Sequence, residues 1–320
     1  MSAKISFLIP EFSPSEEQAE VDDSFYEQKG TLEEIFLLGK DVPIGAKLSQ
    51  KTDLQVRMCL ELVHLHATRD HIVLMDPRMM EINPQEELAL RKSVEDTLQH
   101  FLGDQGEFFS ERWIYPAGLF SDLKTHTPQH AMGLNIDIWM PKDGGTQGLA
   151  KKWRQLQNEI QMIWHDHPVN EARQSRGQLS INSVWLYGIG QQTMIQAHPI
   201  LNGVSKIHSR HPVQLDHRMV SFEMGQLSSS ANEHHFVFAQ DLSVTDWNNL
   251  WSKNIALLAE NNLEKIQLLR MYQGQIQQCT LTKAHLNISL WEKLFSSRNL
   301  IKSKQADWME YSKNLHWTTL

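Results

Sequence analysis

WHDHPVNEARQSRGQLSINSVWLYGIG, residues 164–190, points most directly to the fold of this chain. Apolar residues at helical spacing predict an amphipathic helix over 149–164, and the apolar run at 181–187 predicts a strand. Histidine, asparagine and arginine side chains gather between the two elements. Because α/β proteins commonly bind ligands where helices and strands meet, this junction is a candidate site.

Similar signals recur along the chain. Thr31 and Glu34 form a capping-box pattern at the start of a short helix that Gly39 ends, and Asn83 caps a helix that begins with Pro84. The strands predicted from apolar runs are 5–9, 70–76, 107–115, 181–187 and 234–239, and a hairpin is predicted over 265–281. The predicted helices are 31–39, 84–102, 149–164, 170–176, 246–261 and 287–297.

This alternation of strands and helices predicts an α/β protein with a layered sheet and helices on both faces. The length of 320 residues fits a single large domain over 1–320, or two lobes. Residues 121–148 carry Pro128, Pro141, Gly144 and Gly145, and this irregular segment is the expected junction if there are two lobes.

Composition excludes several classes of protein. The net charge of −8, with no stripe of Lys and Arg, argues against nucleic-acid binding. No apolar run is long enough for a membrane span or a secretory signal, so no membrane partner is expected. Cys59 and Cys279 are isolated thiols and favour a reducing compartment, so a cytoplasmic protein is expected. The ten Trp are expected mainly in the core.

The candidate ligand-binding residues are His167, Asn170, Arg173, Asn182, Gly188 and Gly190. Arg173 offers a forked cation, the two asparagines offer neutral orienting bonds, and the glycines would let main-chain N–H groups approach an anion. A structural alternative has equal weight. In that alternative Asn170 caps the short helix, Arg173 pairs with a neighbouring acid, and Asn182 joins a loop to a strand.

Metal-binding patterns do not stand out among the sixteen His. His165 and His167 are two residues apart and could share a metal only in an extended segment. Neither paired cysteines nor an H-E-x-x-H motif is present. No metal and no cofactor is therefore expected, and no catalytic residue is assigned.

The segment His167-Pro168-Val169-Asn170-x-x-Arg173-x-x-x-Gly177, followed by Asn182 and Trp185-Leu186-Tyr187-Gly188-x-Gly190, resembles a signature of archaeal-type cofactor-independent phosphoglycerate mutases. Those enzymes belong to the alkaline-phosphatase superfamily. The likeness is closer to bacterial proteins called RpfE-type regulatory proteins, in which Asn158-Glu159-x-Gln161-Met162 precedes the same segment. It spans most of the chain and is strongest over 149–190.

The resemblance implies a phosphoglycerate mutase-like fold, but the chain departs from the catalytic pattern. The family enzymes use two metal ions held by Asp and His, with an Asp-Gly pair after the first strand and a Gly-His-Asp-type cluster after a late strand. This chain has Pro10-Glu11-Phe12 and Ala239-Gln240-Asp241 at those places. The expectation is therefore a degenerate relative without catalysis, which acts in regulation by binding a phosphorylated or acidic small molecule.

Two alternatives stay open. One is an active mutase or phosphatase that uses Mn²⁺ or Zn²⁺ on non-standard ligands such as Glu11, Asp241 and a His. The other is a protein–protein adaptor, as a homodimer or with another partner, that docks through Trp308, Tyr311 and Trp317 near the C-terminus.

Overall fold

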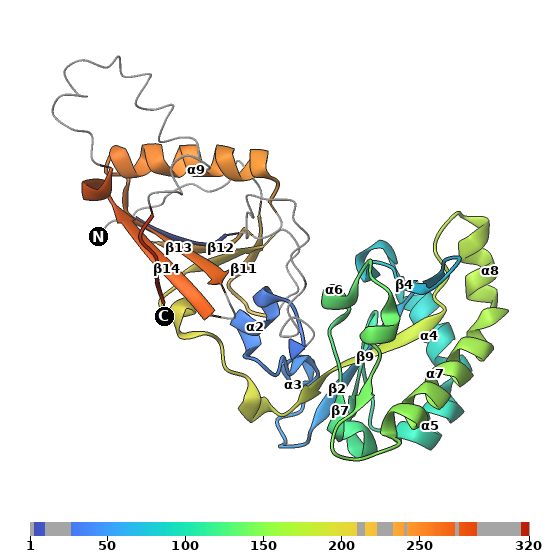
Figure 1. Cartoon of the computed structure of the whole chain (residues 1–320). Helices are drawn as coiled ribbons and strands as arrows, with labels where there is room; N and C mark the ends of the chain where they lie inside the picture. Colours follow the sequence, from blue (N-terminus) through green and yellow to red (C-terminus); the bar gives the residue numbers. More distant parts are fainter. Residues whose placement is uncertain are drawn as a thin grey trace. The chain divides into compact units, whose positions relative to one another are not determined.

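The computed structural model describes residues 3–9, 27–209, 215–222, 233–239, 242–272, 275–286 and 315–319. The chain divides into two compact units, one made of Met1–Glu20 with Ile200–Leu320 and the other of Val21–Pro199. Figure 1 shows the elements of both. Residues 121–148, the junction expected from the sequence, lie inside the second unit.

The first unit is built on a seven-stranded sheet in the order β11-β10-β12-β1-β13-β14-β15. The strands β11, β10, β12, β1 and β13 run parallel, and β14 and β15 are antiparallel to their neighbours. The bounds are β1 (Ala3–Leu8), β10 (Lys206–Ser209), β11 (Met219–Ser221), β12 (His234–Phe238), α9 (Val244–Ala259), β13 (Leu263–Tyr272), β14 (Gln275–Thr282) and β15 (Thr318–Thr319).

One helix covers one face of this sheet. Alternate residues of β1 join the core that includes α9, where the Phe7 and Trp247 rings meet edge to face at 5.3 Å. Leu250, Trp251 and Leu258 of α9 extend the same core at helical spacing. The predicted strand at 234–239, the helix at 246–261 and the hairpin at 265–281 are confirmed. The helix predicted over 287–297 lies outside the described residues.

The second unit contains a four-stranded antiparallel sheet in the order β5-β6-β2-β9. Its strands are β2 (Arg57–Val63), β5 (Glu107–Phe109), β6 (Arg112–Pro116) and β9 (Ser183–Gly190), with two small pairs β3 (Leu65–Ala67) with β4 (Ile72–Leu74) and β7 (Leu123–Lys124) with β8 (Lys142–Asp143). Its helices are α2 (Leu32–Leu38), α3 (Ile44–Leu48), α4 (Pro84–Ser93), α5 (Glu95–Leu102), α6 (Pro128–Ala131), α7 (Leu149–His165) and α8 (Pro168–Ser175).

Strict alternation along β2 separates the two faces of this sheet. Met58, Leu60 and Leu62 join the core that α4, α5 and α7 complete, whereas Cys59 and Glu61 point to the opposite face. Trp113 and Trp164 pack edge to face in that core, and seven Trp of the chain are at least 99% buried. Core packing, the role expected for most Trp residues, is thus confirmed for these seven.

Three predicted elements differ from the structure. The helix over 84–102 is two helices, because Val94 leaves helical geometry and buries its side chain in the core. The run 70–76 contains a shorter strand, β4 at Ile72–Leu74, preceded by the turn from β3, and the run 107–115 contains the turn between β5 and β6. The α/β fold class is confirmed, with the strands in two main sheets, one in each unit.

Candidate functional site

The polar junction singled out in the sequence lies where α7, α8 and β9 follow one another in the second unit. His167 is the N-cap of α8, and its Nδ1 accepts a hydrogen bond from Val169 N–H at 3.2 Å. Pro168 takes the first helical position, where no donor is needed. Partial burial lowers the pKa of His167, which favours the neutral ring that this cap requires. The helix cap is therefore His167 and not Asn170.

Asn170 joins the end of one element to the start of another. Its amide nitrogen donates to Trp164 O and to Ile181 O, both at 2.8 Å, and its Oδ1 accepts from Ile181 N–H at 2.7 Å. The side chain is 2% exposed. Both sides of the amide are thus occupied by main-chain groups of α7 and of the segment before β9.

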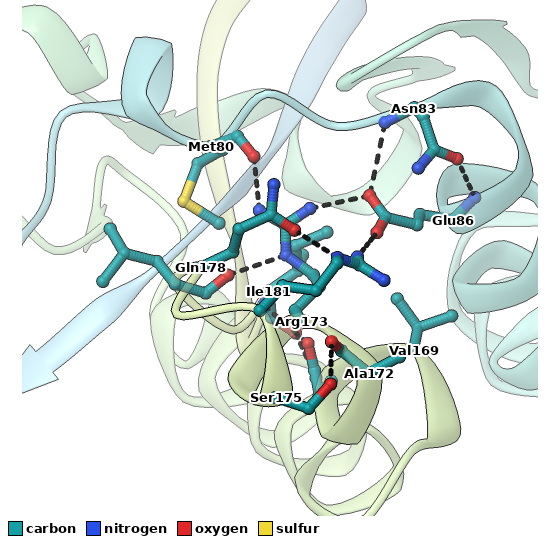
Figure 2. Close-up of polar contacts among 12 residues, drawn as sticks. Met80, Asn83, Glu86, Val169, Ala172, Arg173, Ser175, Gln178 and Ile181 are labelled. Atoms are coloured by element: carbon teal, nitrogen blue, oxygen red, sulfur yellow. Dashed lines mark hydrogen bonds and ion pairs between the residues drawn. The ribbon is translucent and has the colours of Figure 1, made fainter.

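Arg173 is fully buried and its guanidinium is surrounded by acceptors (Figure 2). Nε donates to Leu179 O at 2.7 Å, Nη1 donates to Glu86 Oε2 at 2.6 Å, and Nη2 donates to Met80 O. The Glu86 carboxylate also completes the capping box at Asn83, at the start of α4. Arg173 therefore joins α8 to the N-terminus of α4.

The second carboxylate oxygen of Glu86 holds a different arginine. Arg176 Nη2 donates to Glu86 Oε1 at 2.6 Å, and its Nε donates to Gln178 Oε1 at 2.9 Å. The Arg176 side chain is 50% exposed. One carboxylate thus bridges a buried arginine and an arginine at the surface.

Asn182 continues the β-sheet pattern with its side chain. Leu65 N–H donates to Asn182 Oδ1 at 2.8 Å, and Asn182 Nδ2 donates to Leu65 O at 2.9 Å. The amide therefore replaces a peptide group in linking the start of β9 to β3.

The two glycines of β9 allow the start of α3 to pack closely against this strand. A Cβ on Gly188 would lie 2.8 Å from Ile44 Cβ, and a Cβ on Gly190 would lie 2.5 Å from Pro43 Cβ. Gly188 also has φ +65°, a value that disfavours side chains. The space that an anion would need beside these glycines is taken by the start of α3.

Each of the six predicted residues therefore has a structural contact, but the structure does not bring them to one place: His167 caps α8, which contains Asn170 and Arg173, whereas Asn182 contacts Leu65, and Gly188 and Gly190 pack against the start of α3. Their arrangement matches two parts of the structural alternative, because Arg173 pairs with an acid and Asn182 joins a loop to a strand. A ligand that reached Asn170 or Arg173 would have to replace a main-chain bond or the ion pair with Glu86, which would leave buried groups unpaired.

A second polar cluster lies on the opposite face of the same sheet, and the sequence reasoning missed it. Glu61 on β2 is 1% exposed and accepts from Arg112 Nε at 3.3 Å and from the Tyr187 hydroxyl. Cys59 lies beside Tyr187 in the strand register. Burial, with Glu61 adding to it, raises the pKa of Cys59 to about 12, so this thiol is unreactive at neutral pH.

Glu34 on α2 belongs to the same polar surroundings. Its Oε2 accepts from Thr31 N–H at 2.8 Å, from the Thr31 hydroxyl at 3.1 Å and from the Thr127 hydroxyl at 2.8 Å. Burial raises the pKa of Glu34, and the charge of Glu61 raises it further. This carboxyl group links the start of α2 to the start of α6.

The sequence contains a pattern that indicates this second polar cluster. Residues 57–62 alternate, with Met58, Leu60 and Leu62 at even positions and Arg57, Cys59 and Glu61 at odd positions. That period of two predicts a strand with one polar face, here a face turned inward.

Within the described ranges, no group of three or more His, Cys, Asp or Glu side chains could hold a metal ion. His165, one member of the spaced pair, has a side chain 82% exposed. Glu11 and Asp241 lie outside the described residues. Among the described helices, none has the length and apolar character needed to cross a bilayer.

Comparisons with known proteins found only distant likenesses. No protein-family model and no curated protein matches the chain. Among solved structures, a cofactor-independent phosphoglycerate mutase from Thermoplasma acidophilum DSM 1728 is 15% identical with a TM-score of 0.36, over 95% of this chain and 98% of that one. The PH0037 protein from Pyrococcus horikoshii is 12% identical with a TM-score of 0.33, over 84% of this chain and 81% of that one. Likenesses of this size carry no argument about activity.

Proposed function

We propose that this protein is a phosphoglycerate mutase-like α/β protein that does not catalyse phosphoryl transfer and that acts as a regulatory protein by binding a phosphorylated or acidic small molecule. The proposal rests on the sequence resemblance and on the residues that follow the C-terminal ends of β1 and β12 in the first unit. In this proposal the resembling segment around His167 has a structural role in the fold.

The supporting observation concerns the C-terminal ends of β1 and β12. The two strands are parallel neighbours, and Ala239 N–H donates to Leu8 O at 2.9 Å just beyond them. The resemblance expects metal ligands at these two ends. The first residues there are Ile9, 5% exposed, and Ala239, fully buried, and both belong to the apolar core. Ile9 and Ala239 themselves offer no ligand to Mn²⁺ or Zn²⁺, and the next acidic residues along the chain, Glu11 and Asp241, lie outside the described residues.

The charge at the junction supports an acidic or phosphorylated ligand. Arg176 presents a half-exposed guanidinium beside the buried Arg173, and a guanidinium binds carboxylate and phosphate groups through paired hydrogen bonds. A ligand can therefore meet Arg176 at the surface without breaking the bonds of Arg173.

The test combines an activity assay with a binding assay on the full-length protein. A coupled phosphoglycerate mutase assay in the presence of Mn²⁺ or Zn²⁺ is expected to show no turnover. Calorimetric titration with 3-phosphoglycerate is expected to show binding that Arg176→Ala weakens by about tenfold or more, the loss of one charged hydrogen-bonding group. Lys151→Ala, at an exposed position on α7, is the matched control and should bind as wild type does.

Two results would overturn the proposal. Metal-dependent turnover that Asp241→Asn abolishes would make the chain an enzyme with non-standard ligands. An absence of heat with 3-phosphoglycerate and with inorganic phosphate, for a folded wild-type protein, would remove the small-molecule role.

A further inference from the structure

The outer edge of β14 is largely open in the part of the chain that the structure describes. On one side β14 pairs with β13 along its whole length, from Lys265 opposite Thr282 to Tyr272 opposite Gln275. On the other side the described residues pair only Gln277 and Gln278, which lie opposite β15. Thr280 is exposed. An edge of this kind leaves main-chain donors and acceptors available to another strand.

The side chains of β14 do not oppose such pairing. Residues 275–282 read Gln-Ile-Gln-Gln-Cys-Thr-Leu-Thr, with no charge and no proline. The register with β13 is continuous and has no bulge. Natural sheet edges usually carry a lysine, a proline or a bulge, which prevents pairing between molecules. The edge of β14 has none of these features of its own.

The C-terminal segment 315–319 covers part of this edge. Leu315 and Trp317 pack against the core shared with α9. The Trp317 ring lies over the Arg270 guanidinium, 4.3 Å from ring centroid to Cζ, and Arg270 in turn donates to Gln277 Oε1 at 2.9 and 2.8 Å. The Thr318 hydroxyl donates to Gln278 O at 3.3 Å. Among the described residues this segment is thus anchored by the Leu315 and Trp317 side chains and by the Thr318 hydroxyl, and its strand is two residues long.

We propose that the β14 edge is a self-association surface that pairs with β14 of a second copy of this chain, and that residues 315–319 are a strap that covers part of the edge and so prevents this pairing. The strap pairs antiparallel to β14, so this edge already accepts an antiparallel strand. Two identical strands pair antiparallel about a two-fold axis, in which each copy offers the same groups to the other. A second copy is therefore the partner that fits both the direction and the uncharged surface.

The test measures molecular mass by light scattering over a range of protein concentrations. Truncation after residue 314 is expected to give twice the mass of the full-length protein. Thr280→Lys in the truncated chain is expected to restore the original mass, because a charge on the edge blocks strand pairing. Asn249→Lys, exposed on α9, is the control that adds the same charge away from the edge and should leave the doubled mass unchanged.

Trp317→Ala in the full-length chain gives an independent measurement that does not depend on truncation. It loosens the strap and is expected to double the mass at the higher protein concentrations. The proposal is overturned if the truncated protein, folded by circular dichroism, keeps the mass of the full-length chain. It is equally overturned if Thr280→Lys fails to suppress the association, or if the truncated chain is unfolded and Trp317→Ala leaves the mass unchanged.

Discussion

Glu86 carries two arginines, one on each carboxylate oxygen, and the two differ in exposure. Arg173 has a side chain 1% exposed, and the side chain of Arg176 is 50% exposed. When a buried charge loses its partner, water cannot solvate it, whereas water readily solvates an exposed charge that loses its partner. The same kind of bond therefore contributes differently to stability at the two positions.

The first prediction follows from this difference. Arg173→Ala is expected to lower the free energy of unfolding by about 3–5 kcal/mol, because it removes the buried arginine partner of Glu86 and the donor to the carbonyl groups of Met80 and Leu179. Arg176→Ala is expected to lower it by about 1 kcal/mol or less. Urea unfolding followed by tryptophan fluorescence measures both. Equal losses for the two variants would contradict the structural role assigned to Arg173.

The second prediction concerns Glu34. Its folded-state pKa lies above the ordinary value of 4.5, so between those two values the folded state binds more protons than the unfolded state. Stability is therefore highest at low pH within this window and falls as the pH rises through the folded pKa. Glu34→Gln, which stays neutral, is expected to remove this fall in urea midpoints measured at increasing pH above 4.5.

Glu95→Gln provides the comparison for Glu34, since Glu95 is an exposed carboxylate on α5. It is expected to leave the pH profile of the wild type unchanged. A Glu34→Gln profile that falls as steeply as that of the wild type would show that another group titrates in this window.

At the scale of elements, β9 depends on the close approach of α3. Both Gly177, which follows α8, and Gly188, within β9, have positive φ, at +71° and +65°. Beside Gly177 the space is open, whereas a Cβ on Gly188 would lie 2.8 Å from Ile44 Cβ and 3.1 Å from Gly45 N. Comparing the two glycines separates the cost of the backbone conformation from the cost of steric overlap.

The third prediction compares alanine substitutions at Gly177 and Gly188. Gly177→Ala is expected to cost about 1–2 kcal/mol, the penalty of a side chain in the left-handed region. Gly188→Ala is expected to cost about 1–3 kcal/mol more, because α3 must move away from β9. Chemical denaturation measures the difference. Equal costs would mean that α3 accommodates the added methyl group without loss of packing.

At the scale of the whole molecule, each unit has its own sheet and its own apolar core. The first unit is discontinuous in sequence, since β1 pairs with β12 and β13 from the far end of the chain. Short-range patterns identified these strands one by one. Their parallel pairing is a long-range property, and no local signal in the sequence specified which strand lies beside which.

The sequence alone determined the α/β class, the capped starts of α2 and α4, the long helix α7, the hairpin β13–β14 and the burial of most Trp residues. These features follow from capping residues, from periods of 3.6 and 2, and from turn residues, which act between neighbours in the chain. It also located the polar junction, because unusual residue types gather there.

Only the tertiary structure decided what that junction does. Arg173 meets Glu86 across 87 residues, Asn182 meets Leu65 across 117, and Glu34 meets Thr127 across 93. An arginine with an exposed guanidinium and one enclosed by carbonyl groups have the same local sequence signal. The fold supplies the partner, and the partner decides whether a polar side chain is available to a ligand or is already bonded within the protein.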